Sequence, residues 1–336
     1  MQDITRALIS KAQHERRFTA RAMRCDSTVV EADVRWPSDA GLALDATRLL
    51  AREGAKVAAT VGAGARRVQN RSRAAAKRLR LIGRTVGRRL GRTGGAREQV
   101  LKLTGQAGEL VARSVCEARA LAAQARAKAR GRGAQAKLAA AARLEQAADR
   151  AERVHRQIAR RLAGEKITDR LVSLADPDAR PIGKGKLGKR YEFGYVFQLA
   201  ELTPNTRRGA RGLILPAASA IGAPNESELL PATATELDRL QLRPREIALD
   251  GGFPVDSASQ AFPDSSVFIA GRQQPASRRS TKRLAGYRVG CEGRISHLKR
   301  GYGLRRSRLK GHRGARTWVG WAILAYNLDT LAIRSA

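Results

Sequence analysis

The pattern of apolar and polar positions predicts short strands in two widely separated parts of the chain. Residues 21–35 carry the β-formers Val29 and Val30, and Trp36 and Pro37 end this run. A second group of short apolar runs follows much later in the sequence. In that group we expect strands at 167–175, 191–201, 212–220 and 266–270. A further buried strand is expected in the short run EIALDGGF, at 246–253, which ends in an acid and two glycines.

Between these two groups the pattern is helical. Ser38 and Asp39 are good capping residues for a helix over 38–58. Residues 106–164 are rich in Ala, Arg, Leu and Gln and predict long helices with a break at 131–133. Further helices are expected among the later strands, at 225–242, 287–300 and 315–333.

Strands before and after a helical block predict one α/β domain that is interrupted by a second structure. Residues 1–58 would begin this domain, 59–166 would form a basic Ala/Arg-rich helical insertion, and 167–336 would complete the domain. The insertion is compatible with a hairpin, a coiled coil or an arm that tracks DNA. A solvated helical insertion without a partner explains the same pattern.

The charge balance points to a polyanionic partner. The 336 residues include 65 Lys and Arg but only 30 Asp and Glu, a formal net charge of +35. Residues 66–100 alone hold 12 basic side chains and one acid, Glu98. Phosphate backbones bind such surfaces through counterion release, whatever their sequence. Aromatic residues make up only 4%, which argues against a stacking platform for single strands.

Other functional classes lack their usual signals. The three cysteines and four histidines are scattered, so neither a zinc site nor a disulfide framework is expected, and a reducing compartment is the natural location. The N-terminus has no apolar signal core. The longest apolar stretch, near the C-terminus, is interrupted by Asn327 and Asp329 and is too short for a bilayer of ~30 Å, so it predicts a buried helix. The run 183–190 is rich in Gly and Lys, lacks a phosphate-loop pattern and predicts a hairpin connection.

Two carboxylates stand out in this basic chain. Asp250 follows a hydrophobic run and precedes Gly251 and Gly252, at the strand end where open α/β sheets place ligands. An ordinary turn acid would fit the same local pattern. Glu292 is the only acid between Ser265 and Leu328. On a helix, Arg288, Glu292 and Lys299 fall on one face, so a carboxylate lies between two cations. This arrangement suits a metal ion beside a clamped phosphate, although a neutralising salt bridge is the simpler alternative.

Asp26 is the third candidate, within the strand-like segment around Val29. Its rivals, Asp176 and Asp178, lie beside prolines and are typical of a turn. Three converging carboxylates repel one another and so favour divalent cations, with Mg²⁺ or Mn²⁺ as the natural choice for oxygen ligands. Two such ions would activate a nucleophile and stabilise a leaving oxygen at phosphorus.

The order Asp26, Asp250 and Glu292, in the segments DSTVVEADVRWPSD, ALDGGF and YRVGCEGRISHLKRGYGLRRSRLKG, resembles the bacterial insertion-sequence DDE transposases. Many of these carry a Tyr-x2-Arg-x3-Glu-x6-Lys signature. Arg288, Glu292 and Lys299 keep the spacing of its last three members, whereas position 285 is Ala and Tyr287 adjoins the arginine. Only 25 residues precede Asp26, where such enzymes usually have a helical DNA-binding region, so the chain resembles an N-terminally shortened member.

The resemblance implies an RNase H-like fold, in which a mixed sheet with flanking helices is interrupted here by the long basic insertion. It implies that Asp26, Asp250 and Glu292 hold two Mg²⁺ or Mn²⁺ ions for DNA strand cleavage and strand transfer. Arg288 and Lys299 would hold the DNA backbone near the metals, and Arg305, Arg306, Arg308 and Lys310 would extend the phosphate track. The expected partner is double-stranded DNA, both transposon ends and target, bound by a homo-oligomer in the bacterial cytoplasm beside the nucleoid, without a membrane. The alternatives are a non-catalytic basic nucleic-acid-binding protein and a decayed transposase fragment that binds DNA without cutting it.

Overall fold

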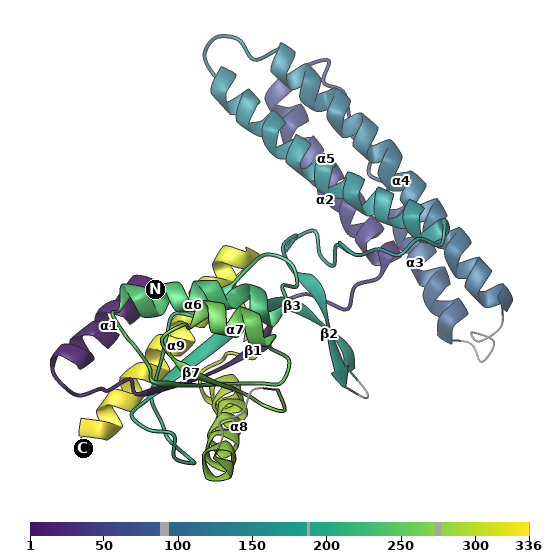
Figure 1. Cartoon of the computed structure of the whole chain (residues 1–336). Helices are drawn as coiled ribbons and strands as arrows, with labels where there is room; N and C mark the ends of the chain where they lie inside the picture. Colours follow the sequence, from purple (N-terminus) through teal and green to yellow (C-terminus); the bar gives the residue numbers. More distant parts are fainter. Residues whose placement is uncertain (88–93, 187–188, 273–276, 336) are drawn as a thin grey trace. The chain divides into compact units, whose positions relative to one another are not determined.

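The computed structural model describes residues 1–87, 94–186, 189–272 and 277–335. They form two compact units (Figure 1). One unit combines Met1–Asp33 with Asp178–Ala336 and contains the β-sheet, and we call it the sheet unit. The other, Val34–Pro177, is built from helices, and we call it the helical unit. The prediction of a mixed α/β fold with flanking helices is therefore confirmed.

The helical unit begins earlier and ends later than the predicted insertion at 59–166, because the first predicted helix packs within it. Figure 1 shows α2, α4 and α5 side by side along their lengths. Small buried residues such as Ala107, Ala118 and Ala148 line the shared core of these helices. The predicted break at 131–133 separates two helices, and Gly131 and Gly133 both adopt positive φ there. The helices of this unit are α2 (Asp39–Val61), α3 (Ser72–Gly87), α4 (Gly94–Ala127) and α5 (Ala134–Leu162).

The strand predicted at 167–175 is absent, and this prediction is wrong. Hydrogen bonds to the side chain of Gln157 in α5 satisfy the backbone of Leu171: its N–H donates over 2.8 Å and its carbonyl accepts over 3.3 Å. Ser173 Oγ then accepts the backbone N–H groups of Ala175 and Asp176 in a turn. The apolar residues of this segment pack against helices, so their burial requires no sheet partner.

The sheet of the other unit has the strand order β2-β3-β1-β6-β7. β1 (Ala22–Ala32) pairs antiparallel with β3 (Lys189–Thr203) on one side and parallel with β6 (Glu246–Leu249) on the other. β6 in turn pairs parallel with β7 (Ser266–Ile269), and β2 (Arg180–Lys186) pairs antiparallel with β3. The predicted 183–190 connection lies at this β2–β3 hairpin, and its residues 187 and 188 are outside the described part. Three short strands complete the sheet: β4 (Leu213–Ile214) and β5 (Ala218–Ser219) beside β3, and β8 (Arg306–Ser307) beside β1.

Side-chain alternation divides the sheet unit into layers. Ala22, Ala248 and Phe268 face one side, where they pack against Leu284 and Tyr287 of α8. Their strand neighbours at 23, 247 and 267 face the opposite core, which includes residues of α1, α6 and α7. Figure 1 shows α8 on one side of the strands and α6 and α7 on the other. The helices of this unit are α1 (Gln2–His14), the short 3-10 helix η2 (Glu226–Leu229), α6 (Leu230–Arg239), α7 (Val255–Ala261), α8 (Arg278–Gly301) and α9 (Gly311–Ser335).

The C-terminal apolar stretch forms α9, which buries one face as predicted, whereas Trp321, Leu328 and Ile333 are exposed. Asn327 is fully buried there, and its side-chain amide accepts from the N–H of Ile214 and donates to the carbonyl of Ile214, both over 2.8 Å. The Asn327 side chain therefore hydrogen-bonds the backbone on the outer edge of β4, as a neighbouring strand would. Among the described residues, no helix combines the length and the apolarity needed to cross a membrane.

Candidate functional site

Asp26 and Asp250 lie on neighbouring parallel strands. The register pairs Met23 with Ile247 and Arg24 with Ala248. Two residues further along each strand, the same register aligns Asp26 with Asp250, which directly follows the end of β6. Because alternate residues share a face, Asp26 faces the same side of the sheet as Arg24, which is the side that α8 covers.

α8 is held over this side by Arg24. The Arg24 Nη1 donates to the carbonyl oxygen of Tyr287 over 2.9 Å, and the guanidinium lies 5.0 Å from the centre of the Tyr287 ring. A Cβ at Gly290 would lie 1.9 Å from Arg24 Nη1, so the glycine permits this close approach between helix and strand. The next residues of α8 therefore pass over the part of β1 that contains Asp26.

Arg288 stands between two of the three predicted metal ligands. Its Nη1 lies 3.2 Å from Asp250 Oδ1, and its Nη2 donates to Glu292 Oε1 over 3.3 Å. The Arg288 side chain is 16% exposed, whereas those of Asp250 and Glu292 are 48% and 63% exposed. Both carboxylates thus keep one side open to solvent while they share one guanidinium.

Asp26 belongs to the same electrostatic cluster. Burial raises the pKa of Asp26, and the negative charges of Asp250 and Glu292 raise it further. The backbone N–H of Ser27, which donates to Asp26 Oδ1 over 2.7 Å, and the Arg288 guanidinium lower the pKa, but they do not outweigh the burial. Arg288 therefore contacts Asp250 and Glu292, and Asp26 lies close enough for the charges of all three residues to influence its pKa.

As placed, these carboxylates do not form a closed cage for one ion. Within the described ranges, no three His, Cys, Asp or Glu side chains are grouped closely enough to hold a metal. The rivals of Asp26 act elsewhere: Asp178 Oδ2 accepts the backbone N–H of His312 over 3.1 Å near the start of α9, and Asp176 is buried.

A buried polar network supports the site, and the sequence analysis did not identify it. Glu201 Oε2 accepts from Arg24 Nη2 over 2.7 Å, and Glu201 Oε1 accepts from Arg294 Nε of α8 over 3.0 Å. Glu201 Oε1 also accepts the N–H of Gly212 over 2.9 Å. One carboxylate thus joins β1, β3 and α8. The sequence held one signal for this network: Arg24 and Glu201 are charged residues that each lie within an apolar strand segment.

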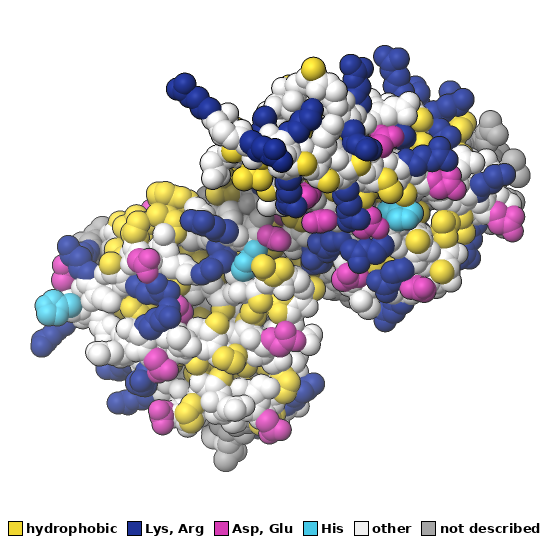
Figure 2. All heavy atoms as spheres, turned by 90° about the horizontal axis from the view of Figure 1, so that it is seen from above, with side chains coloured by type: hydrophobic (Ala, Val, Ile, Leu, Met, Phe, Trp, Pro, Cys, Tyr) yellow, Lys and Arg dark blue, Asp and Glu magenta, His cyan; other side chains and the backbone are white. Residues whose placement is uncertain are grey.

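The predicted phosphate-binding residues differ in their surroundings. Lys299 is half-buried two turns after Glu292 on α8. Arg306 lies on β8 next to the end of β1 and pairs with Glu31 over 3.0 Å, so its charge is partly neutralised. Exposed basic side chains without a partner among the described residues flank this strand, namely Arg305, Arg308 and Lys310. On the face drawn in Figure 2, Lys and Arg outnumber the acidic side chains scattered among them.

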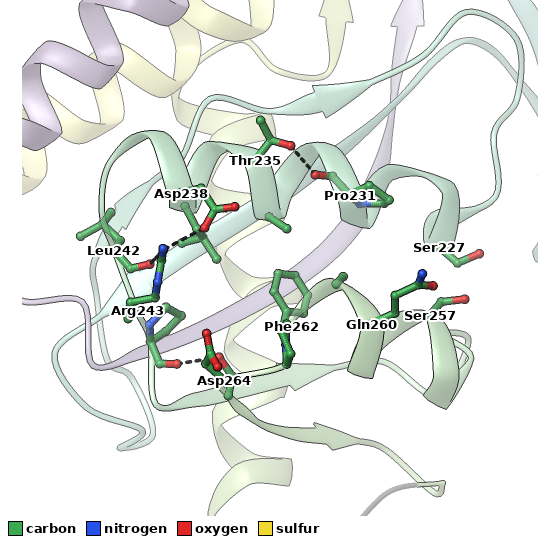
Figure 3. Close-up of a pocket in the computed structure, with 16 residues that line it drawn as sticks. Ser227, Pro231, Thr235, Asp238, Leu242, Arg243, Ser257, Gln260, Phe262 and Asp264 are labelled. Atoms are coloured by element: carbon green, nitrogen blue, oxygen red, sulfur yellow. Dashed lines mark hydrogen bonds and ion pairs between the residues drawn. The ribbon is translucent and has the colours of Figure 1, made fainter.

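A cavity of about 520 Å³ lies away from these residues. It opens between α6 and α7, with Thr235 and Asp238 from the first helix, Gln260 from the second, and the Phe262 ring directed toward α6 (Figure 3). Arg243 pairs with Asp238 at this cavity over 2.9 Å. Since none of the predicted site residues lines it, the cavity is separate from the carboxylate cluster.

Comparisons with protein-family models, with curated proteins and with solved structures give no match for this chain.

Proposed function

We propose that the protein is a metal-dependent DNA strand-cleaving and strand-joining enzyme of the DDE transposase type. The observation that carries this proposal is the convergence of Asp250 and Glu292 on the Arg288 guanidinium, with Asp26 beside Asp250 by the register of β1 and β6. An acid at one strand, another at the end of the parallel neighbour and a third on the covering helix form the arrangement that the resemblance implies.

The sheet supports the finer assignment to an RNase H-like fold. β1 is central, with an antiparallel neighbour on one side and two successive parallel strands on the other. The helical unit enters the chain between β1 and β2, so it leaves the order of the strands within the sheet undisturbed.

The donor set fits a divalent cation by its chemistry. Carboxylate oxygens are the preferred ligands of Mg²⁺ and Mn²⁺, and burial together with the charges of Asp250 and Glu292 raises the pKa of Asp26, so a cation there would be stabilising. Asp26, Asp250 and Glu292 would hold the ions. When bound, such ions lower the pKa of a water nucleophile and stabilise the departing 3′ oxygen at phosphorus.

Basic side chains of the chain would then hold the DNA backbone at the site. A cation bound by Asp250 and Glu292 would compete with Arg288 for their oxygens, and a guanidinium displaced in this way would be available to a phosphate of the bound DNA. Lys299 would hold the same backbone two turns along α8, and the cations Arg305, Arg308 and Lys310 would extend the track. Such contacts position DNA but do not read its sequence.

A plasmid-nicking assay tests the proposal. The wild-type chain should nick supercoiled DNA with Mg²⁺ or Mn²⁺, and Glu292→Gln should abolish nicking while DNA binding stays nearly unchanged. Asp256→Asn, which replaces an exposed acid of α7 outside the cluster, is the matched control and should nick like the wild type. Equal nicking by Glu292→Gln and the wild type would refute the assignment.

One observation favours a second candidate, a non-catalytic basic DNA-binding protein. Arg288 already pairs with Asp250 and Glu292 without a metal, as expected of purely structural salt bridges. This candidate predicts salt-sensitive DNA binding and no nicking with any divalent ion, so the same assay separates the two functions.

A further inference from the structure

The most uniformly charged surface of the helical unit lies on α3. At 100° per residue, Arg73, Lys77, Arg80 and Arg84 fall within about 60° of one another on this helix. We call these four residues the α3 basic stripe. All four side chains are exposed. From Arg73 to Arg84 the stripe extends over about 16 Å of helix at 1.5 Å per residue.

The opposite face of α3 anchors the helix to its unit. Ala75 is fully buried, and Leu79 and Ile82 on the same face are half-buried. α3 packs against α2 and α4. The α3 basic stripe is therefore presented outward by a helix whose other face is fixed.

No acid compensates this charge. Residues 54–97 contain neither Asp nor Glu. The nearby carboxylate of Glu117 in α4 is already taken by Arg71, whose Nη1 donates to it over 2.7 Å, and by the backbone N–H of Gln69 over 2.8 Å. Among the described residues, the four stripe side chains have no hydrogen bond or ion pair.

Some cations of α4 and α5 are instead paired with acids of the same unit. Arg119 of α4 pairs with Asp149 of α5 over 3.4 Å, and Arg126 of α4 pairs with Glu145 of α5. Cations between α4 and α5 are thus neutralised within the unit. A purely solvated helical face would be expected to show the same mixture of signs, and α3 does not.

We infer that the α3 basic stripe is a DNA-binding surface in its own right, which contacts the phosphates of duplex DNA. Phosphates follow one another at about 3.4 Å per base pair along a strand, so about 16 Å of stripe spans several of them. α3 has no aromatic side chain on which unpaired bases would stack, which argues against single strands. The stripe consists only of Lys and Arg, which favours positioning on the backbone over the reading of bases.

Duplex DNA fits better than duplex RNA. The major groove of B-form DNA admits a helix with its side chains, whereas that of an A-form duplex is too deep and narrow. This inference does not depend on the chemistry proposed for the carboxylate cluster in the sheet unit, because the stripe would bind DNA whether or not that cluster cleaves it.

The test is the salt dependence of DNA binding by the full chain. Binding is measured by fluorescence anisotropy with two labelled duplexes of unrelated sequence. The quadruple variant Arg73→Gln, Lys77→Gln, Arg80→Gln and Arg84→Gln should bind both duplexes about tenfold or more weakly at low salt. Its slope of log affinity against log salt should be smaller by about 3–4, since each lost phosphate contact removes nearly one unit.

A dispersed variant is the matched control. Gln at Lys102, Arg113, Arg143 and Arg156 removes the same charge from exposed positions of α4 and α5, and it should change the slope by less than about one unit. Thermal melting by circular dichroism checks that both variants are folded. Equal slopes for the two variants would overturn the inference, as would equal stripe-dependent binding of duplex RNA or of an acidic protein.

The plasmid assay keeps this inference separate from the proposed enzyme function. If the wild-type chain binds DNA through the α3 basic stripe but never nicks it, the proposed enzyme function is contradicted and the DNA-binding role of the stripe is supported. A chain that nicks plasmids while the stripe variant binds like the wild type contradicts the stripe alone.

Discussion

Arg24 of β1 and Glu201 of β3 face each other in the strand register and form an ion pair that is almost completely buried, with side chains 1% and 2% exposed. The same guanidinium donates to the Tyr287 carbonyl of α8, and the same carboxylate accepts from Arg294 of α8. The position of the helix that carries Arg288 and Glu292 thus depends on a charge pair inside the sheet unit.

The first prediction concerns this pair. Glu201→Gln leaves the buried Arg24 guanidinium without its counter-charge, so the free energy of unfolding should fall by about 3–5 kcal/mol. Chemical denaturation measures the change. Glu246→Gln is the matched control, because its partner Arg283 is partly exposed, and it should cost no more than about 1 kcal/mol. Similar losses in both variants would show that burial does not set the strength of the Arg24–Glu201 pair.

The second prediction uses the contact between α8 and β1. Gly290→Ala places a Cβ where Arg24 Nη1 lies, and the guanidinium is held there by Glu201 and Tyr287. The variant should lose about 1–3 kcal/mol of stability through overpacking, although alanine is the better helix former. Gly286→Ala, on the same helix with open space around it, should instead gain about 0.5–1 kcal/mol. A gain in both variants would mean that α8 does not rest on Arg24.

The third prediction concerns the guanidinium shared by Asp250 and Glu292. Arg288→Gln frees both carboxylates, so Mg²⁺ should bind roughly two- to tenfold more tightly in the absence of DNA. Isothermal titration calorimetry measures the affinity. Lys299→Gln removes the same charge at a position two helical turns after Glu292, and it should leave Mg²⁺ affinity nearly unchanged. Weaker Mg²⁺ binding by Arg288→Gln would contradict the competition between arginine and metal.

The fourth prediction is a pH dependence that arises at His312. Burial lowers the pKa of His312 below its ordinary value of 6.5, and the charge of Arg316 adds to this effect, whereas Asp178 opposes it. The imidazole of His312 takes up a proton more readily in the unfolded chain than in the folded one. The contribution of neutral His312 to the free energy of unfolding is therefore fully present above pH 6.5 and is lost as the pH falls below that value. Urea denaturation of the wild type should show less stability at lower pH in this window.

His312→Gln should flatten this dependence. His297→Gln should remove a further part, since burial and Arg294 also lower the pKa of His297. An unchanged pH profile in the double variant would assign the dependence to other groups.

Local pattern predicted most of the sheet unit because its strands have clear apolar runs and sharp ends. The strand at 21–35 and the segment before Asp250 became β1 and β6, whose alternation separates two buried faces. Residues 2–14 form α1, a helix that was not predicted although its buried residues Thr5, Ile9 and Ala12 recur at helical spacing. Ile9 is nonetheless fully buried in the core beneath the sheet.

The site was predictable only in part. Glu292 stood out as an isolated acid, Asp250 because it ends an apolar run, and Asp26 through its strand-like segment and the family resemblance. A helical period placed Arg288 beside Glu292. That Arg288 also reaches Asp250 depends on how α8 packs over the sheet, which no local pattern contains. The role of Glu201 depends on a partner 177 positions away in the sequence, so only the folded chain reveals it.

The insertion of the helical unit between β1 and β2 has a consequence for how the chain folds. β1 emerges early during synthesis but must wait for its partner β3 until every helix from α2 to α5 has been made. The helical unit has mostly local contacts and can condense first, which draws Asp33 and Asp178 into one neighbourhood and shortens the loop that β1 and β3 must close. Until β3 has been made, this edge of β1 has no strand partner, and unpaired strand edges are prone to association with other chains.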